Sequence, residues 1–339
     1  MIRRYARRRA NAGRGRLTDA TRAALPAAVL SLWTLAVAAC GPAPASPAAL
    51  NSPPADAAAP THSPMPTPTA TPRPTPTATP AATPSSVVSL AGTYLALGDS
   101  LAGGVGASDP NRLGYVVLLF ERLNVPGGVA GIAANRLANV AVGGETSSSF
   151  IEGGQLATAV RLIAEAEPPV SLVTLDIGGN DLLRLLNTEP CTSAPASAEC
   201  GDLVNVTLDA FAENAARILG DLRRALDEAD SAAPLAVMTY FNPFSGTDDL
   251  YEAAADRALL GADGRADCET ARQTPGARGM NDIIACLAEE HGAVLVDVEP
   301  LFAGLGLELT HIGSQDIHGN DTGYAVIANA FAEALTFRQ

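Results

Sequence analysis

Short apolar runs recur along the chain from residue 94 onward, and they predict buried β-strands. They are continuous rather than alternating, which is typical of parallel strands covered by helices on both faces. Most of them end at glycine or near proline, the residues that commonly interrupt strands. The runs cover residues 94–97, 139–142, 170–177, 235–239 and 293–298.

Between these runs, apolar residues recur three or four positions apart, which is the spacing of amphipathic helices. The segments are 115–123, 155–166, 206–229 and 278–291, and a last helix is expected over 322–335 with Asp321 as its N-cap. Alternating strands and helices predict an α/β fold, with a parallel sheet of about five strands between two helical layers. The functional site of such a sheet lies at the carboxyl ends of the strands.

The N-terminal segment has a different composition. Residues 1–22 contain eight arginines and one acidic residue, and an apolar run over 23–39 ends in Ala38-Ala39-Cys40-Gly41. This order is typical of a secretory signal, and a cysteine after small residues resembles the lipobox of bacterial lipoproteins. We therefore expect a signal peptide over 1–39 and a lipid anchor at Cys40, which would hold the protein at the extracytoplasmic cell surface. The alternative is an uncleaved membrane anchor, for which the run is short.

The next segment, residues 40–88, is predicted to be a disordered tether. It contains 14 prolines, and Ala, Thr and Ser make up most of the rest. Such a composition has too few large apolar side chains to form a core. Because proline favours extended polyproline II, the tether should be stiff and should hold the following domain away from the membrane.

Residues 89–339 are expected to form one globular domain with a strongly acidic surface. The domain has 13 arginines, 34 acidic residues and no lysine, so its formal charge is −21. Nucleic acids and anionic lipid headgroups would be repelled. We therefore expect no nucleic-acid partner, membrane contact only through the anchor, and a monomer.

Four cysteines lie in this domain, an even number that in an exported protein suggests two disulfides. Three pairings are possible. Proximity in sequence favours Cys191 with Cys200, and Cys268 with Cys286. No Cys-x-x-Cys motif or nearby histidine pair accompanies them, so we expect no zinc site.

The first predicted strand ends in Gly98-Asp99-Ser100-Leu101. A serine at this place would have an exposed hydroxyl and an N–H near a helix N-terminus, and both suit a nucleophile. On its own the motif is ambiguous, because a serine that only caps a helix would look the same.

Three further motifs follow in order. The second strand is followed by Gly143-Gly144-Glu145-Thr146, the third by Gly178-Gly179-Asn180-Asp181, and Asp316-Ile317-His318 precedes the last helix. The set resembles the SGNH/GDSL hydrolase superfamily from residue 93 to about 337. The resemblance implies a flavodoxin-like, three-layer α/β/α domain that hydrolyses carboxylic esters through an acyl-enzyme, with no metal or organic cofactor.

The resemblance also implies roles for particular residues. Ser100 would be the nucleophile and His318 its base, while the oxyanion would be held by the Ser100 N–H, the Gly144 N–H and the Asn180 amide. The family usually places an acid three residues before the histidine, but that position is Gln315 here and the acid is Asp316. Either Asp316 orients His318, or the acid is dispensable and a backbone carbonyl holds the ring.

The substrate class is the least determined feature of the sequence. Lipid esters, small-molecule esters and acetylated glycans all belong to the superfamily's range. An aromatic content of 4% and the lack of a long apolar lid favour a short- or medium-chain acyl esterase. Two other functions stay open: a surface binding protein that keeps the fold without turnover, and an acyltransferase that uses the same residues.

Overall fold

The computed structural model describes residues 92–247, 250–261, 264, 268–269 and 278–337. The expected signal peptide, the lipidation site Cys40 and the tether over 40–88 lie outside the described residues, so these expectations stay predictions. None of the described helices combines the length and the apolar character that a membrane crossing requires.

The domain is built on a parallel sheet of five strands in the order β2-β1-β3-β4-β5. β1 and β3 lie at the centre and are almost completely buried, which explains why their sequences are continuously apolar. The strands are β1 Thr93–Gly98, β2 Arg136–Asn139, β3 Val170–Asp176, β4 Leu235–Met238 and β5 Val294–Val296.

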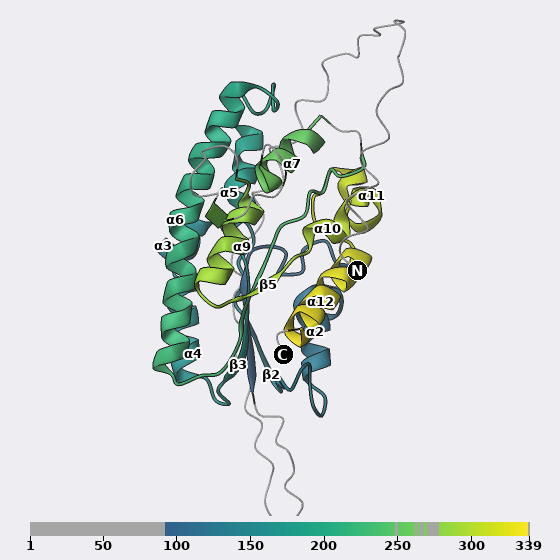
Figure 1. Cartoon of the computed structure of the whole chain (residues 1–339). Coiled ribbons are helices and arrows are strands. Elements are labelled where there is room, and N and C mark those ends of the chain that lie inside the picture. Colours follow the sequence, from purple (N-terminus) through teal and green to yellow (C-terminus); the bar gives the residue numbers. More distant parts are fainter. Residues whose placement is uncertain (1–91, 248–249, 262–263, 265–267, 270–277, 338–339) are drawn as a thin grey trace, which may run out of the picture. The chain divides into compact units, whose positions relative to one another are not determined.

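Helices cover both faces of the sheet, so the predicted three-layer α/β/α architecture is confirmed (Figure 1). One layer contains α2 (Tyr115–Leu123), α12 (Asp321–Thr336) and the short α1 (Pro110–Leu113), α10 (Glu299–Phe302) and α11 (Gly306–Leu309). The other contains α3 (Ser147–Glu152), α4 (Gln155–Glu165), α6 (Ala198–Glu228), α7 (Glu252–Leu260) and α9 (Met280–Glu290). The segment after β3 forms α5 (Gly179–Leu183) and the 3₁₀ helix η3 (Arg184–Asn187), and the 3₁₀ helix η4 (Ile312–Ser314) precedes the C-terminal motif.

The largest buried side chains lie where the helices meet the sheet. On the side of α2 and α12, the ring of Tyr115 stacks on Phe331 with a centroid distance of 5.2 Å and on Tyr324 at 6.5 Å. All three rings are fully buried. This contact fixes α12, the helix that follows the C-terminal motif, against the helix that follows β1.

The second strand was predicted wrongly by three residues. The apolar run over 139–142 indicated a strand, but β2 covers Arg136–Asn139. β2 is an edge strand whose residues are half-buried or exposed, so a search for continuous apolar residues misplaces it. The chain after Asn139 still runs beside β1, since the N–H of Val140 donates to the carbonyl oxygen of Ala96 at 3.0 Å.

Two helix predictions also differ from the structure, and α7 was not predicted. Asn320, rather than Asp321, caps α12, because its side chain accepts the N–H groups of Thr322 and Gly323. The helix α6 begins at Ala198, eight residues before the predicted start at 206, after a cap by Ser197. Its first turns are poor in large apolar residues, and the alanine-rich helix α7 lacked the expected periodicity, so the pattern missed both.

Both favoured disulfides are present, Cys191–Cys200 and Cys268–Cys286. The first joins the loop after η3 to the first turn of α6.

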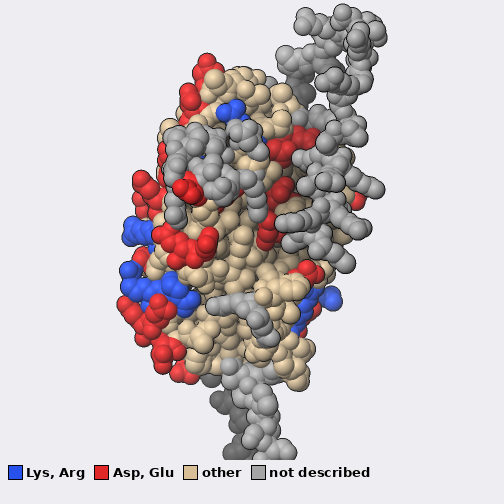
Figure 2. Space-filling model, viewed as in Figure 1, with Lys and Arg blue, Asp and Glu red and all other residues tan. Residues whose placement is uncertain are grey.

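Figure 2 shows acidic side chains scattered over the face in view, with arginine side chains gathered beside acidic ones. Among the described residues, several arginines pair with an acidic residue one turn away on the same helix, such as Arg161 with Glu165 on α4 and Arg223 with Asp227 on α6. Pairs this exposed contribute little to stability. The pairs nevertheless place several of the domain's few arginines next to acidic side chains.

Candidate active site

The motifs singled out in the sequence meet at the carboxyl ends of the strands. Ser100 follows β1, Gly144 lies in the loop after β2, and Asn180 lies in α5, directly after β3. His318 comes from the loop that precedes α12. Because all strands are parallel, their carboxyl ends share one edge of the sheet, and residues far apart in sequence come together there.

A continuous hydrogen-bonded chain links Ser100, His318 and Asp316. The Oγ of Ser100 lies 2.8 Å from Nε2 of His318, and Nδ1 of the same ring lies 2.6 Å from Oδ1 of Asp316. With the ring proton on Nδ1, the histidine donates to the carboxylate and Nε2 is free to accept the serine proton. This is the arrangement of a nucleophile, a base and an orienting acid.

Asp316 is the acid in this chain, despite its displaced position in the sequence. Partial burial alone would raise the pKa of Asp316, but the backbone N–H and the ring of His318 donate to the carboxylate and bring the pKa below its usual value. The carboxylate therefore stays ionised at neutral and mildly acidic pH. Its side chain is 44% exposed, whereas that of His318 is 19% exposed.

The loop of His318 is held against the loop that follows Ser100. The N–H of His311 donates to the carbonyl oxygen of His318 at 3.0 Å, and the His311 ring contacts the carbonyl oxygen of Gly106 at 2.8 Å. Gly106 has a φ of +92°, and a Cβ at this position would lie 2.8 Å from the Cβ of His318. His311 therefore supports the loop of His318, and Gly106 permits the close approach of the two loops.

Asp99 shapes the turn that presents Ser100. One carboxylate oxygen accepts the N–H of Leu101 at 2.9 Å, and the other accepts the hydroxyl of Tyr240 at 2.8 Å. Complete burial raises the pKa of Asp99 to about 6, although both of these hydrogen bonds lower it. The side chain thus binds the nucleophile loop and the neighbouring aromatic ring.

Two of the expected oxyanion donors, the backbone N–H groups of Ser100 and Gly144, have no protein acceptor among the residues that the structure describes. Gly144 is exposed and has a φ of +78°, a conformation that glycine adopts without strain. Free N–H groups beside a nucleophile can donate to a developing oxyanion.

The third expected donor, Asn180, already has protein acceptors. Its Nδ2 donates to the carbonyl oxygen of Glu145 at 3.0 Å and to Oδ2 of Asp99 at 3.3 Å. The first bond holds the amide beside the Gly144 loop. The second is long, so an oxyanion is able to share or replace it.

Gln155 is a residue of the site that the sequence analysis missed. Its Oε1 accepts the N–H of Gly98 at 2.8 Å, and its Nε2 donates to the carbonyl oxygen of Gly98 at 3.1 Å and to Oε2 of Glu145 at 2.9 Å. Gln155 is buried. It joins the strand end before Ser100 to the residue after Gly144. Nothing in the local sequence marks it, because it occupies the first position of an ordinary helix.

The glycines before Asn180 are required by packing. A Cβ on Gly178 would lie 2.5 Å from the ring of Phe211, and one on Gly179 would lie 2.5 Å from the ring of Tyr240. Gly178 also has a φ of +122°. Because these two adjacent residues have no side chains, the start of α5 can pack closely against both rings.

Asp181 connects the site to α3. Its carboxylate accepts the N–H of Ser147 at 2.8 Å and the Ser147 hydroxyl at 2.6 Å. Burial raises the pKa of Asp181, although these hydrogen bonds lower it. The residue binds backbone and hydroxyl groups of a neighbouring helix.

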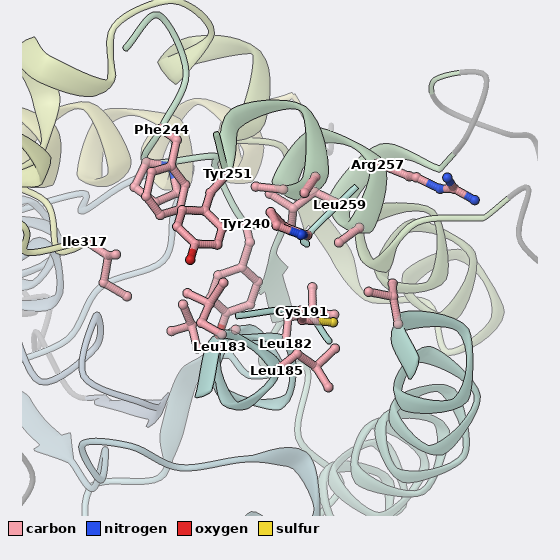
Figure 3. A pocket seen from close by; sticks show the side chains of 18 of the residues that line it. Leu182, Leu183, Leu185, Cys191, Tyr240, Phe244, Tyr251, Arg257, Leu259 and Ile317 are labelled. Atoms are coloured by element: carbon pink, nitrogen blue, oxygen red, sulfur yellow. The ribbon is translucent and has the colours of Figure 1, made fainter. Parts of the chain in front are cut away.

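Ser100, Asn180 and His318 line one cavity of about 340 Å³. Figure 3 shows other side chains of the wall of this cavity. Most of its remaining wall is apolar and comes from α5, η3, the loop after β4, and α7. Among the described residues, no three His, Cys, Asp or Glu side chains are grouped so that they could hold a metal ion.

Comparison with solved structures finds several hydrolases. The lipase Lip_vut3 from a goat rumen metagenome is 18% identical, with 72% of this chain and 97% of that chain covered and a TM-score of 0.45. The acetylxylan esterase Axe2 from Geobacillus stearothermophilus is 17% identical, with 72% and 94% covered and a TM-score of 0.44. The esterase EstA from a Pseudoalteromonas species is 19% identical, with 73% and 97% covered and a TM-score of 0.41. At these values the likenesses indicate nothing about the substrate of this chain.

No curated protein matches the chain significantly. The model of the GDSL-like lipase/acylhydrolase family, however, matches residues 96–326, which is more than half of the chain and includes every motif described above. The chain therefore belongs to the GDSL-like lipase/acylhydrolase family and is a hydrolase of ester bonds.

Proposed function

We propose that the protein is a serine esterase that hydrolyses carboxylic esters through an acyl-enzyme on Ser100. The observation that carries this proposal is the hydrogen-bonded chain from Ser100 Oγ through His318 to Asp316, with distances of 2.8 and 2.6 Å. A serine hydroxyl is a weak nucleophile unless an adjacent base removes its proton. His318 is placed to do this, and Asp316 fixes the ring and its tautomer.

In the first half of the reaction, Ser100 Oγ forms a bond to the ester carbonyl carbon while its proton passes to Nε2 of His318. The carbonyl oxygen becomes an oxyanion, which the N–H groups of Ser100 and Gly144 and the amide of Asn180 stabilise. The bond to the alcohol oxygen then breaks, and His318 gives its proton to the departing alcohol. The acyl group stays on Ser100.

In the second half, a water molecule attacks the acyl carbon while His318 takes one of its protons. The bond to Ser100 Oγ breaks, His318 returns the proton to the serine, and a carboxylic acid leaves. The sum is ester plus water giving acid plus alcohol. Attack by a sugar or another alcohol in place of water would transfer the acyl group instead, which is the acyltransferase alternative.

The test is hydrolysis of p-nitrophenyl esters by the full chain and by Ser100→Ala. Ser148→Ala is a matched control, because Ser148 is an exposed serine outside the cavity lining. We expect loss of turnover only in Ser100→Ala. Turnover that persists in Ser100→Ala would contradict the role of the serine, and a folded wild type without turnover would favour the binding protein. A product ester formed from an added alcohol would identify acyl transfer.

We further propose that the enzyme is exported and held at the cell surface by a lipid on Cys40. Support comes from the sequence: arginines, an apolar run and small residues precede this cysteine, and a proline-rich tether follows it. The two disulfides of the domain agree with an oxidising compartment. Metabolic labelling with a palmitate analogue should mark the wild type and not Cys40→Ser. Labelling of both proteins would place the lipid elsewhere.

A further inference from the structure

The cavity beside Ser100 extends well beyond the reacting atoms. Figure 3 shows Ile317 on one side of this space and Cys191 and Leu259 on the opposite side, with the ring of Tyr240 between them. Because Ser100 and His318 line the same cavity, a group bound there is continuous with the ester bond that they would cleave.

The wall of this cavity is apolar. Four leucines of α5 and η3 line one side and are only half-buried, although each belongs to a compact segment between β3 and α6. Aromatic and aliphatic side chains of the β4–α7 loop and of α7 line the opposite side. The four leucines are Leu182, Leu183, Leu185 and Leu186; the β4–α7 loop and α7 contribute Phe241, Phe244, Ala258 and Leu259.

The two tyrosine hydroxyls in the wall are already paired. The hydroxyl of Tyr240 donates to Asp99, and the hydroxyl of Tyr251 donates to the carbonyl oxygen of Thr192 at 3.0 Å. The guanidinium of Arg257 points away from the labelled leucines in Figure 3. A ligand in this space therefore meets hydrocarbon surface away from the catalytic end, which favours an alkyl chain over a sugar.

The volume sets an approximate chain length. A protein cavity of about 150 Å³ holds one benzene molecule. A cavity of about 340 Å³ has room for roughly twice as many carbon atoms, or about twelve. An acetyl group would leave most of this space unfilled.

The placement of the catalytic groups indicates that the acyl chain of the ester, rather than its alcohol, lies inside the cavity. Asn180, an expected oxyanion donor, opens α5, and the next turns of the same segment carry the leucines of the wall. His318 must protonate the departing alcohol, and its partner Asp316 has a 44% exposed side chain. The alcohol therefore leaves on the open side, and the acyl chain runs from the oxyanion site along α5 and η3.

We propose that this cavity is an acyl-binding pocket that selects medium-chain esters with about eight to twelve acyl carbons. This inference rests on the proposed esterase function, and it replaces the broad substrate range that the sequence leaves open with one class. The alcohol part lies outside the pocket, so its length and polarity are predicted to have little influence on the rate.

The first test is kcat/KM of the full chain for p-nitrophenyl acetate, butyrate, hexanoate, octanoate and decanoate. Burial of each methylene contributes to binding, so kcat/KM should rise by about fourfold per methylene where the chain fills the pocket. We expect octanoate to exceed acetate by about 100-fold or more. An equal or higher value for acetate would overturn the proposal.

The second test separates the two halves of the ester. Acetate esters of ethanol, butanol and octanol lengthen only the alcohol, and we expect their kcat/KM values to differ by less than about threefold. A steep rise along this series, with a flat acyl series, would assign the pocket to the alcohol and overturn the proposal.

The third test fills the pocket. Leu185→Trp adds bulk at a half-buried wall position, and the ratio of kcat/KM for decanoate to that for acetate should fall by about tenfold. Leu301→Trp is the matched control, because Leu301 is exposed and lies outside the wall; its ratio should equal that of the wild type. An unchanged ratio in folded Leu185→Trp would contradict the proposal.

Labelling of Ser100 by a small fluorophosphonate distinguishes failure of the acyl-pocket proposal from failure of the proposed esterase function. If the wild type is labelled and hydrolyses the acetate ester best, the esterase function is supported and the medium-chain pocket is contradicted. A folded wild type that is not labelled and hydrolyses no ester would fail at the proposed function itself.

Discussion

Oδ1 of Asp316 accepts two hydrogen bonds from His318, one from the backbone N–H at 3.0 Å and one from the ring Nδ1 at 2.6 Å. An aspartate commonly accepts the backbone N–H of the residue two positions later. Here that local turn also brings the carboxylate to the ring. A spacing of two residues thus serves the same purpose as the spacing of three that the family usually has.

Asp316→Asn should lower kcat by roughly 10- to 1000-fold and change KM little. The amide keeps the size of the side chain but removes the negative charge that stabilises the protonated ring, and it favours the wrong tautomer. Steady-state kinetics at pH 7 and 8 provide the measurement. The half-exposed carboxylate is screened by solvent, so the loss should be smaller than that for Ser100→Ala. A kcat within twofold of wild type would show that the acid is dispensable.

Gln155→Ala should impair catalysis without contacting the substrate. It removes three buried hydrogen bonds that join Gly98 to Glu145, so the Ser100 turn and the Gly144 loop lose their common support. We expect kcat to fall by about 10- to 100-fold while KM stays within a few-fold, and the free energy of unfolding to fall by about 1–3 kcal/mol.

The control for this prediction is Arg161→Ala, an exposed position on the same helix. Gln155→Glu tests the role of the amide itself, since a carboxylate cannot donate to Gly98 or Glu145 and should not restore kcat. If Gln155→Ala lost stability and kept its kcat, Gln155 would be a structural residue only.

Asp176 should make the protein more stable at acidic than at alkaline pH. Burial, followed by the charge of Asp99, raises the pKa of Asp176 well above its usual value. A carboxyl group with a raised pKa binds more protons in the folded than in the unfolded state. Its favourable contribution is therefore present at low pH and is lost as the pH rises through the folded pKa.

Asp176→Asn tests this directly, because the amide has nearly the same shape and no charge to bury. The free energy of unfolding, measured with urea between pH 5 and 8, should depend less on pH in the variant than in the wild type. Asp202→Asn, an exposed position on α6, should keep the wild-type slope. Identical slopes for wild type and Asp176→Asn would mean that Asp176 does not hold its proton in this range.

The two disulfides should differ in their effect on specificity. Replacing Cys191 and Cys200 by serine removes a crosslink that closes a short loop, which should cost about 2–3 kcal/mol of stability. Both residues also line the acyl pocket, so the preference for octanoate over acetate should decrease. The corresponding change at Cys268 and Cys286 should lower stability and leave the preference unchanged, because neither residue lines the pocket. If both double variants changed the preference for octanoate over acetate equally, the proposed role of Cys191 and Cys200 in the pocket wall would be contradicted.

Much of the site could be predicted because strand ends are marked in the sequence. Ser100, Gly144 and Asn180 each follow an apolar run, and parallel topology brings such positions to one edge of the sheet. His318 precedes a helix whose apolar periodicity is plain. The resemblance to the family's motifs implied the roles of these residues, and their place on regular elements agrees with it.

Other parts depend on contacts that no local pattern records. Gln155 and Tyr240 act on Gly98 and Asp99 from segments 57 and 141 residues away in the chain. The pocket needs the facing positions of η3 and α7, and α7 was not predicted. The displaced Asp316 left two alternatives open, because the choice depends on a side-chain rotamer rather than on residue type.

Trapping the acyl-enzyme would show whether Ser100 carries the acyl group during turnover. The full chain would be mixed with p-nitrophenyl octanoate, quenched in acid within milliseconds, digested and examined by mass spectrometry. We expect one octanoyl group, located on Ser100, and none on the Ser100→Ala variant. An octanoyl group on another residue, or equal acylation of Ser100→Ala, would contradict this expectation.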